Sequence, residues 1–155
     1  MNYLNLNEIT QIHFEHTSKC NLLCPQCARV TDEGTVNPYM PIDEMSLDDY
    51  KNILTPDVVK YVNNVFWCGN YGDSIASNNF LECLEFVKST GIEGIGIVTN
   101  ASARTPDWWR KLAKILDGPK HSITISVDGL KDTNHLYRVN SNWNKIIENV
   151  TAFVQ

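Results

Sequence analysis

The chain has 155 residues, of which 43% are hydrophobic and 20% are charged, proportions that are ordinary for one globular domain. Its net charge of −5, without a cluster of Lys or Arg, gives no sign of a surface for a phosphate backbone. The start of the sequence lacks the pattern of a signal peptide, and no apolar stretch reaches the ~18–20 residues that span a bilayer. With five cysteines, this composition predicts a soluble cytoplasmic protein whose thiols serve metal or redox chemistry rather than disulfides.

Four short β-rich runs recur along the chain, and helix-like segments separate them. We expect strands at residues 12–16, 64–68, 95–99 and 122–127. After the first run, Ser46 begins a capping-box-like sequence for a helix that extends to about Leu54. After the second run, Ser77 or Asn78 is expected to cap a helix that Gly91 terminates.

Two further helices are expected after the third and fourth runs. Thr105 and Pro106 supply an N-cap and a first helical position, and this helix should end before Gly118. The last helix keeps its apolar spacing from Trp143 to Val154, with no Gly or Pro after it. Because strands and helices alternate, we expect an α/β fold with a parallel sheet and right-handed crossovers.

The number of βα units indicates which α/β fold to expect. An eight-unit barrel has about 250 residues, and about four units are expected here. We therefore interpret residues 1–155 as the N-terminal portion of a partial (β/α) TIM-like barrel, truncated inside its fourth helix. Such a half barrel would leave the fourth strand with an unpaired edge, so self-association through that edge is expected.

Three cysteines, Cys20, Cys24 and Cys27, have the spacing C-x3-C-x2-C, with no fourth cysteine nearby. Electron-carrying iron–sulfur clusters usually have four thiolates, and structural zinc sites are also closed by four ligands. Three thiolates on one loop would instead hold three irons of a [4Fe–4S] cluster and leave the fourth iron for a substrate or cofactor. The alternative is a zinc site completed by His13, His16 or a distant ligand.

The strand and loop from Glu15 to Cys27, together with residues 45–50, resemble the radical S-adenosylmethionine (SAM) superfamily, and in particular its peptide-modifying and activating-enzyme branches. The resemblance covers nearly the whole chain. It implies that the three cysteines ligate a [4Fe–4S] cluster, and that the methionyl amine and carboxylate of SAM chelate its unique iron. Reductive cleavage of SAM would then give a 5′-deoxyadenosyl radical that abstracts hydrogen from a substrate. A reductant such as flavodoxin or ferredoxin is implied, whereas the substrate could be a peptide, a nucleotide or a small metabolite.

The run 69–74 follows the second expected strand and resembles the family's Gly-Gly-Glu-Pro motif. The resemblance implies that Gly72 and Asp73 bind the methionyl ammonium of SAM, with Asp73 in place of the glutamate. Tyr71 and Ser74 depart from the motif, since they replace a glycine and the proline.

Four more cofactor contacts are implied by the resemblance. Gln26 precedes the last cysteine, where the family usually has an aromatic residue beside the adenine. Asn100 belongs to a segment that resembles a Thr-Asn-Gly turn at the rim of the site. Ser126 would face the ribose, and Arg138 could pair with the cofactor carboxylate, a task that suits a guanidinium.

Other readings of these residues stay open at this point. Cys68 and Cys83 are expected to be small hydrophobic residues, although Cys68 ends a strand and remains a weak candidate ligand. Glu15 is either a buried acid near the site or a solvated or salt-bridged residue at the end of a strand. The chain as a whole could be a non-catalytic iron–sulfur or zinc-binding module from a truncated reading frame, or an interaction module without metal.

Overall fold

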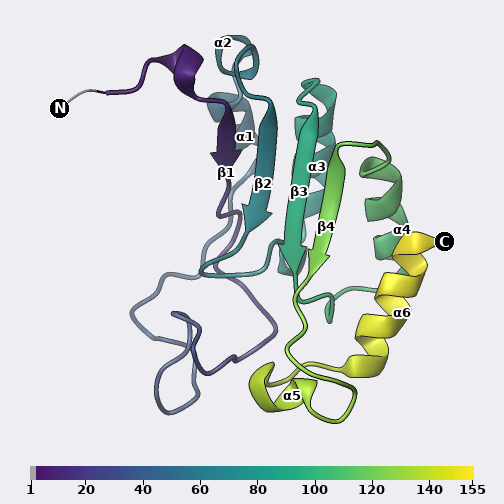
Figure 1. Ribbon diagram of the computed structural model, residues 1–155. Coiled ribbons are helices and arrows are strands. Elements are labelled where there is room, and N and C mark those ends of the chain that lie inside the picture. The colour runs from purple at the N-terminus through teal and green to yellow at the C-terminus, as the bar shows by residue number, and fades with distance from the viewer. Residues whose placement is uncertain (1–2) are drawn as a thin grey trace.

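The computed structural model describes residues 3–155 and contains one four-stranded parallel sheet (Figure 1). The strands pair in chain order, which places each next to its sequence neighbour. Their bounds are β1 Gln11–His13, β2 Asn64–Cys68, β3 Gly94–Thr99 and β4 His121–Ile125. The carboxyl ends of all four strands therefore lie along one edge of the sheet.

Helices connect the strands and cover one face of the sheet (Figure 1). The elements before and between β1 and β2 are η1 Leu6–Glu8, α1 Leu47–Ile53 and α2 Pro56–Val59. They are followed by η2 Ser74–Ala76, α3 Phe80–Ser89, α4 Pro106–Ile115, α5 Asn134–Tyr137 and α6 Trp143–Val154. Helix α6 packs against α4 beside β4, and the long segment between β1 and α1 lies beyond the carboxyl ends of the strands. No helix within residues 3–155 is both long enough and apolar enough to cross a membrane.

The core lies between the sheet and the helices, because alternate strand residues point to opposite faces. Val65 and Trp67 of β2 and Ile95 and Ile97 of β3 are buried against the helices. Phe66 and Gly96, which lie between these residues and point to the opposite face, are only partly buried, and no helix of residues 3–155 covers that face. In a barrel this second face would be the interior.

The expected fold class is confirmed, since the chain forms an α/β partial barrel with four parallel strands. The strand predictions were shifted at both edges of the sheet. β1 ends at His13 because only one further amide, that of Phe14, continues the ladder to Phe66 O, at 3.0 Å. β4 ends at Ile125, after which the Ser126 amide still donates to Thr99 O at 2.8 Å.

The helix-start predictions were right where the side chain of the N-cap residue accepts a hydrogen bond from its own helix. Ser46 and Thr105 accept hydrogen bonds from Asp49 N and Trp108 N, at 3.2 and 3.4 Å. The prediction for α3 was wrong: its N-cap is Asn79, without a side-chain capping bond.

The N-cap of α3 was missed because tertiary contacts use the polar side chains at its start. Asn79 donates from Nδ2 to Met45 O at 2.9 Å, and its Oδ1 accepts from Ser77 Oγ at 2.5 Å. The short helices α2 and α5 were not predicted, because four residues give no usable periodicity.

Candidate cofactor site

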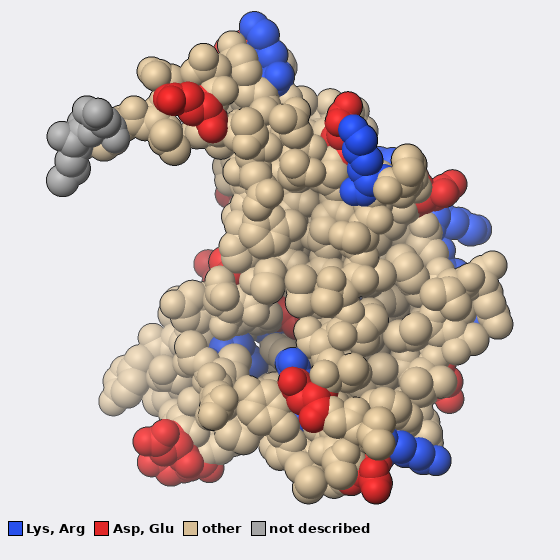
Figure 2. Space-filling view, viewed as in Figure 1, with Lys and Arg blue, Asp and Glu red and all other residues tan. Residues whose placement is uncertain are grey.

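A cavity of about 250 Å³ opens at the carboxyl ends of the strands, between the sheet and the segment that follows β1. Figure 2 shows this region hollowed, with Lys or Arg atoms visible in the opening. All nine predicted site residues line it, although they come from five separate segments of the chain: Cys20, Cys24, Gln26, Cys27, Gly72, Asp73, Asn100, Ser126 and Arg138. The structure thus brings these residues together, whereas their roles remain proposals.

The cysteine loop is held by its backbone on both sides of Cys24. Leu22 is buried, and the Leu23 amide donates to Val139 O, just beyond α5, at 3.1 Å. The Cys27 amide donates to Cys24 O at 3.0 Å, which closes a turn. All three thiols are free, Cys24 being buried and the other two partly exposed.

The environments of Cys20 and Cys24 favour the protonated form of these two thiols. Burial raises the pKa of Cys20 to about 11, and the nearby Asp73 charge acts in the same direction. Burial also raises the pKa of Cys24. Within residues 3–155, no three His, Cys, Asp or Glu side chains form a group that could hold a metal ion as they stand.

N–H groups nevertheless point at two of the sulfurs. Cys20 Sγ accepts from Leu22 N at 3.4 Å and from Asn100 Nδ2 at 3.6 Å. Arg138 Nη1 lies 4.0 Å from Cys24 Sγ. Such contacts stabilise a thiolate more than a thiol, so these donors suit sulfurs that bind metal.

The loop 69–73 packs directly on the backbone that leads into the cysteine loop. A Cβ at Gly72 would lie 1.9 Å from Thr17 O and 2.9 Å from Lys19 O, so only glycine fits. The next amide, that of Asp73, donates to Lys19 O at 2.8 Å. Gly72 is therefore required for the close contact between the loops that follow β1 and β2.

Glu15 holds the opposite end of the loop 69–73. Its carboxylate accepts from Asn70 N at 3.0 and 3.1 Å and from Asn70 Nδ2 at 2.5 Å, and it pairs with His13 Nε2 at 3.2 Å. Of the two roles considered for Glu15, the structure favours the salt-bridged residue near the end of the strand, because the side chain is about one-third exposed and pairs with His13. From this position it also supports the loop 69–73.

Asp73 is the buried carboxylate of the cavity, and its two oxygens accept four hydrogen bonds. Oδ2 accepts from Thr99 Oγ1 at 3.0 Å, from Asn100 N at 2.9 Å and from Asn100 Nδ2 at 2.7 Å. Oδ1 accepts from Ile75 N at 3.3 Å. Burial raises the pKa of this carboxyl, whereas the four donors and the charge of Arg138 favour ionisation. A cationic ligand would also favour the ionised form.

The turn after β3 presents Asn100 to both loops. Ala101 has a φ of +55°, and the Asn100 side-chain oxygen accepts from Ser102 N at 2.8 Å. Asn100 Nδ2 therefore faces Asp73, Cys20 and also Asn21 Oδ1, at 3.2 Å. This turn links the cysteine loop to the carboxylate.

The remaining predicted residues lie on the β4 side or at the mouth. Ser126 is partly buried directly after β4, and Gln26 is exposed. Arg138, at the end of α5, forms an ion pair with Asp128. One guanidinium thus lies between a surface carboxylate and the Cys24 sulfur.

Sequence reasoning did not select Arg29, a buried cation that also lines the cavity. Arg29 lies two residues after Cys27, but no local pattern in the sequence indicates that its side chain is buried. Cys68 lines the cavity as well, whereas Cys83 is fully buried in the core face of α3, as expected for a small hydrophobic residue.

The histidines considered for a zinc site lie elsewhere. His13 Nε2 donates to Cys68 O at 3.0 Å, and His16 Nδ1 accepts from the Tyr50 hydroxyl at 2.9 Å. Neither lines the cavity of the cysteines. The hydroxyl of Tyr50 also accepts from Trp67 Nε1 at 2.8 Å, so His16 belongs to a buried aromatic cluster.

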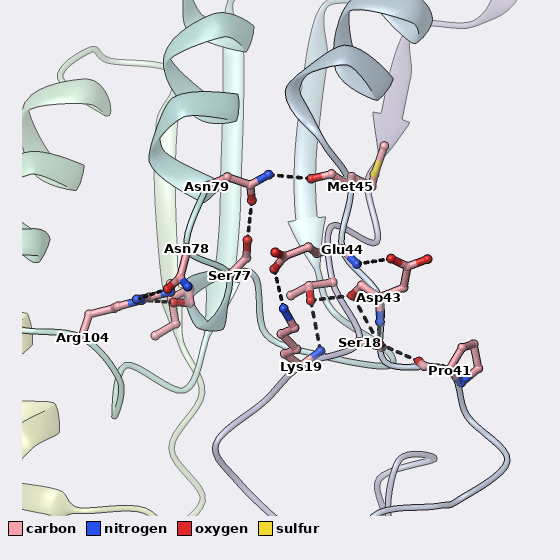
Figure 3. A network of polar contacts seen from close by, with 12 residues as sticks. Ser18, Lys19, Pro41, Asp43, Glu44, Met45, Ser77, Asn78, Asn79 and Arg104 are labelled. Atoms are coloured by element: carbon pink, nitrogen blue, oxygen red, sulfur yellow. Dashed lines mark hydrogen bonds and ion pairs between the residues drawn. The ribbon is translucent and has the colours of Figure 1, made fainter.

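A larger hollow, of about 460 Å³, is lined mainly by residues 15–18 and by residues between 40 and 45. It contains none of the nine predicted residues, so size alone does not identify the site. Figure 3 shows how residues 41–45 are fastened there: Lys19 pairs with Glu44 at 3.0 Å, and Ser18 Oγ donates to Pro41 O at 2.8 Å. This network fixes the start of the cysteine loop.

Comparison with solved structures agrees with this fold. The chain is similar to "Native anSMEcpe with bound AdoMet", with 19% identity and a TM-score of 0.66, over 94% of this chain and 40% of that one. It is also similar to "Native anSMEcpe with bound AdoMet and Cp18Cys peptide", with 18% identity and a TM-score of 0.64, over 94% and 39%. The chain therefore spans about 40% of the length of the solved structures it matches.

Comparison at the level of sequence identifies the family. No curated protein matched the chain. The family model described as the radical SAM superfamily, whose members use a [4Fe–4S] cluster and SAM, matches residues 14–155. Because this match covers most of the sequence, the chain belongs to the radical SAM superfamily.

Proposed function

We propose that this domain binds a [4Fe–4S] cluster through Cys20, Cys24 and Cys27, and that it binds SAM beside the cluster for reductive cleavage. The observation that carries the proposal is one cavity that combines three free thiols, a buried carboxylate and two guanidinium groups. Thiolates are the ligands of such clusters, and a carboxylate together with a guanidinium matches the ammonium and carboxylate of a methionyl group.

Besides its thiols, the cavity contains a buried positive charge that suits an anionic metal cluster. Arg29 is 3% exposed, and within residues 3–155 no carboxylate lies at ion-pair distance from it. A buried cation without a counter-charge is costly, and a cluster bound by three thiolates would supply negative charge beside it. The donor set and its charges therefore fit the cluster.

Each of the six predicted site residues other than the cysteines has a part in the proposal. Asp73 and the backbone at Gly72 bind the methionyl ammonium, and Arg138 binds the carboxylate. Asn100 orients Asp73 and donates to the Cys20 sulfur. Ser126 would face the ribose of SAM, and Gln26 would lie beside its adenine. Together these residues would hold SAM in one orientation and limit the access of water.

When bound, the cluster and SAM supply the redox chemistry, which yields a 5′-deoxyadenosyl radical for hydrogen abstraction from a substrate. A reduced flavodoxin or ferredoxin would provide the electron. Because the chain spans about 40% of its structural relatives, substrate recognition is assigned to no residue here. The extent of the domain beyond residue 155, the cytoplasmic location and self-association through β4 stay predictions.

Anaerobic reconstitution with iron and sulfide tests the proposal. We expect about four irons per chain, binding of SAM, and 5′-deoxyadenosine after addition of dithionite. Single Cys→Ser variants at positions 20, 24 and 27 should lose most of the iron, whereas Cys83→Ala, outside the cavity, should keep it. A chain that holds one zinc, takes up no iron and does not bind SAM would contradict the proposal and favour the zinc-binding alternative.

A further inference from the structure

Arg29 is held in the wall of the cavity by the backbone on either side of the first cysteine. Its Nε donates to Ser18 O at 2.8 Å, and its Nη1 donates to Leu22 O at 3.1 Å. These two carbonyls lie two residues before and two residues after Cys20. The guanidinium therefore bridges the loop that carries this thiol.

Within residues 3–155, no carboxylate forms an ion pair with Arg29. The cavity contains Asp73, but the oxygens of that carboxylate face Thr99, Asn100 and Ile75. The other guanidinium of the cavity, on Arg138, already has Asp128 as its partner. Of the two arginines, Arg29 is thus the one whose positive charge acts on the cavity without a paired anion among residues 3–155.

We infer that Arg29 is an electrostatic positioning residue, which bridges the Cys20 loop and stabilises the reduced state of the cluster through its buried charge. This inference rests on the proposed function. Addition of one electron increases the negative charge of the cluster, so a fixed cation nearby favours the reduced form. Burial keeps solvent from screening the interaction, in contrast to a surface arginine.

Two substitutions separate the charge of Arg29 from its hydrogen bonds. Arg29→Gln removes the charge and can still donate to one carbonyl, whereas Arg29→Lys keeps the charge and loses the planar fork. Arg110→Gln is the matched control, because Arg110 lies on α4 with a half-exposed side chain and pairs with Asp107 at 2.6 Å. Neither Arg110 nor Asp107 lines the cavity.

The readout is the midpoint potential of the reconstituted cluster, titrated spectroscopically in the absence of SAM. A buried unit charge at short range shifts such an equilibrium by on the order of tenfold. We expect Arg29→Gln to lower the reduced-to-oxidised ratio at fixed potential by about tenfold, which is 59 mV for one electron. Arg29→Lys and Arg110→Gln should stay within about threefold of the parent chain.

If Arg29→Gln takes up no iron, its potential cannot be measured, and the iron uptake of the two Arg29 variants is compared instead. If Arg29→Lys loads while Arg29→Gln does not, the charge is needed and the inference stands. Failure of both variants to load, or a loaded Arg29→Gln with the parent potential, overturns it. A parent chain that takes up no iron would instead contradict the proposed function itself, so the two failures are distinguishable.

Discussion

Replacement of Asp73 by Asn tests whether the buried charge, rather than the shape of its loop, serves the cofactor. Asn has the same size, but only one of its terminal atoms accepts hydrogen bonds. Oδ2 of Asp73 accepts three hydrogen bonds, whereas Oδ1 accepts only the long bond from Ile75 N at 3.3 Å. The amide nitrogen of the variant should therefore take the place of Oδ1.

The structure sets the size of both expected effects. The variant loses the long hydrogen bond from Ile75 N, and the N–H groups of its amide face that of Ile75. The free energy of unfolding should therefore fall by about 1–2 kcal/mol. Loss of the carboxylate leaves the methionyl ammonium without its buried partner, which costs about 2–5 kcal/mol in binding. SAM affinity should therefore fall by at least about 30-fold, with the fold intact.

Calorimetric titration of SAM into anaerobically reconstituted protein measures the affinity, and iron analysis with circular dichroism shows whether cluster and fold are retained. Asp107→Asn is the control, since that side chain is 86% exposed on α4. A loaded Asp73→Asn variant that binds SAM as tightly as the parent would refute the assignment of the ammonium to Asp73.

Three further predictions concern the surroundings of the site. Gly72→Ala should displace the loop 69–73, because its Cβ would lie 1.9 Å from Thr17 O, and SAM binding should weaken at least tenfold. Gly96→Ala is the control and should bind SAM normally, because its Cβ would meet no atom closer than 3.4 Å. Equal titration curves for the two variants would contradict this prediction. Burial lowers the pKa of His16 to about 4, so protonation of this residue favours the unfolded chain. The free energy of unfolding in urea should therefore fall by about 3 kcal/mol as the pH falls from 6.5 to 4, with no contribution from this residue above pH 6.5. That part of the pH dependence should be absent in His16→Asn. Asn149→Ala should lower the free energy of unfolding by about 2 kcal/mol, because the fully buried Asn149 donates to Ala101 O and Ala103 O at 2.9 and 3.0 Å; an unchanged urea midpoint would argue against it.

The sequence was sufficient for the fold because its local signals agreed with the tertiary structure. Thr105 and Pro106 start α4 as expected, and Gly91, at a φ of +85°, follows the end of α3. The signal failed at Ser77 and Asn78, because Ser77 donates to the Asn79 side chain and Asn78 accepts from Arg104 instead of capping the helix. Local propensity cannot reveal such a competing tertiary contact.

The position of the site could be predicted for a related reason, whereas its charge pairing could not be predicted. Residues that follow parallel strands meet at one edge, so Asp73, Asn100 and Ser126 were brought to the cysteines by topology alone. The charge balance of the cavity was not predictable, because the burial of Arg29 depends on carbonyls that only the folded loop presents. Pairing between Arg138 and Asp128 likewise depends on the turn between β4 and α5.

The hydrogen bonds that join the loops at the strand ends have a consequence for the thermodynamics of binding. The amides of Asp73, Asn100 and Ser126 each donate to a segment that follows, or ends, a different strand. Their hydrogen exchange should therefore be nearly as slow as that of the sheet, even before any cofactor is present. Since the entropy of ordering these loops is lost during folding, SAM would bind to a surface that is already rigid, and only a small further increase in protection is expected on binding.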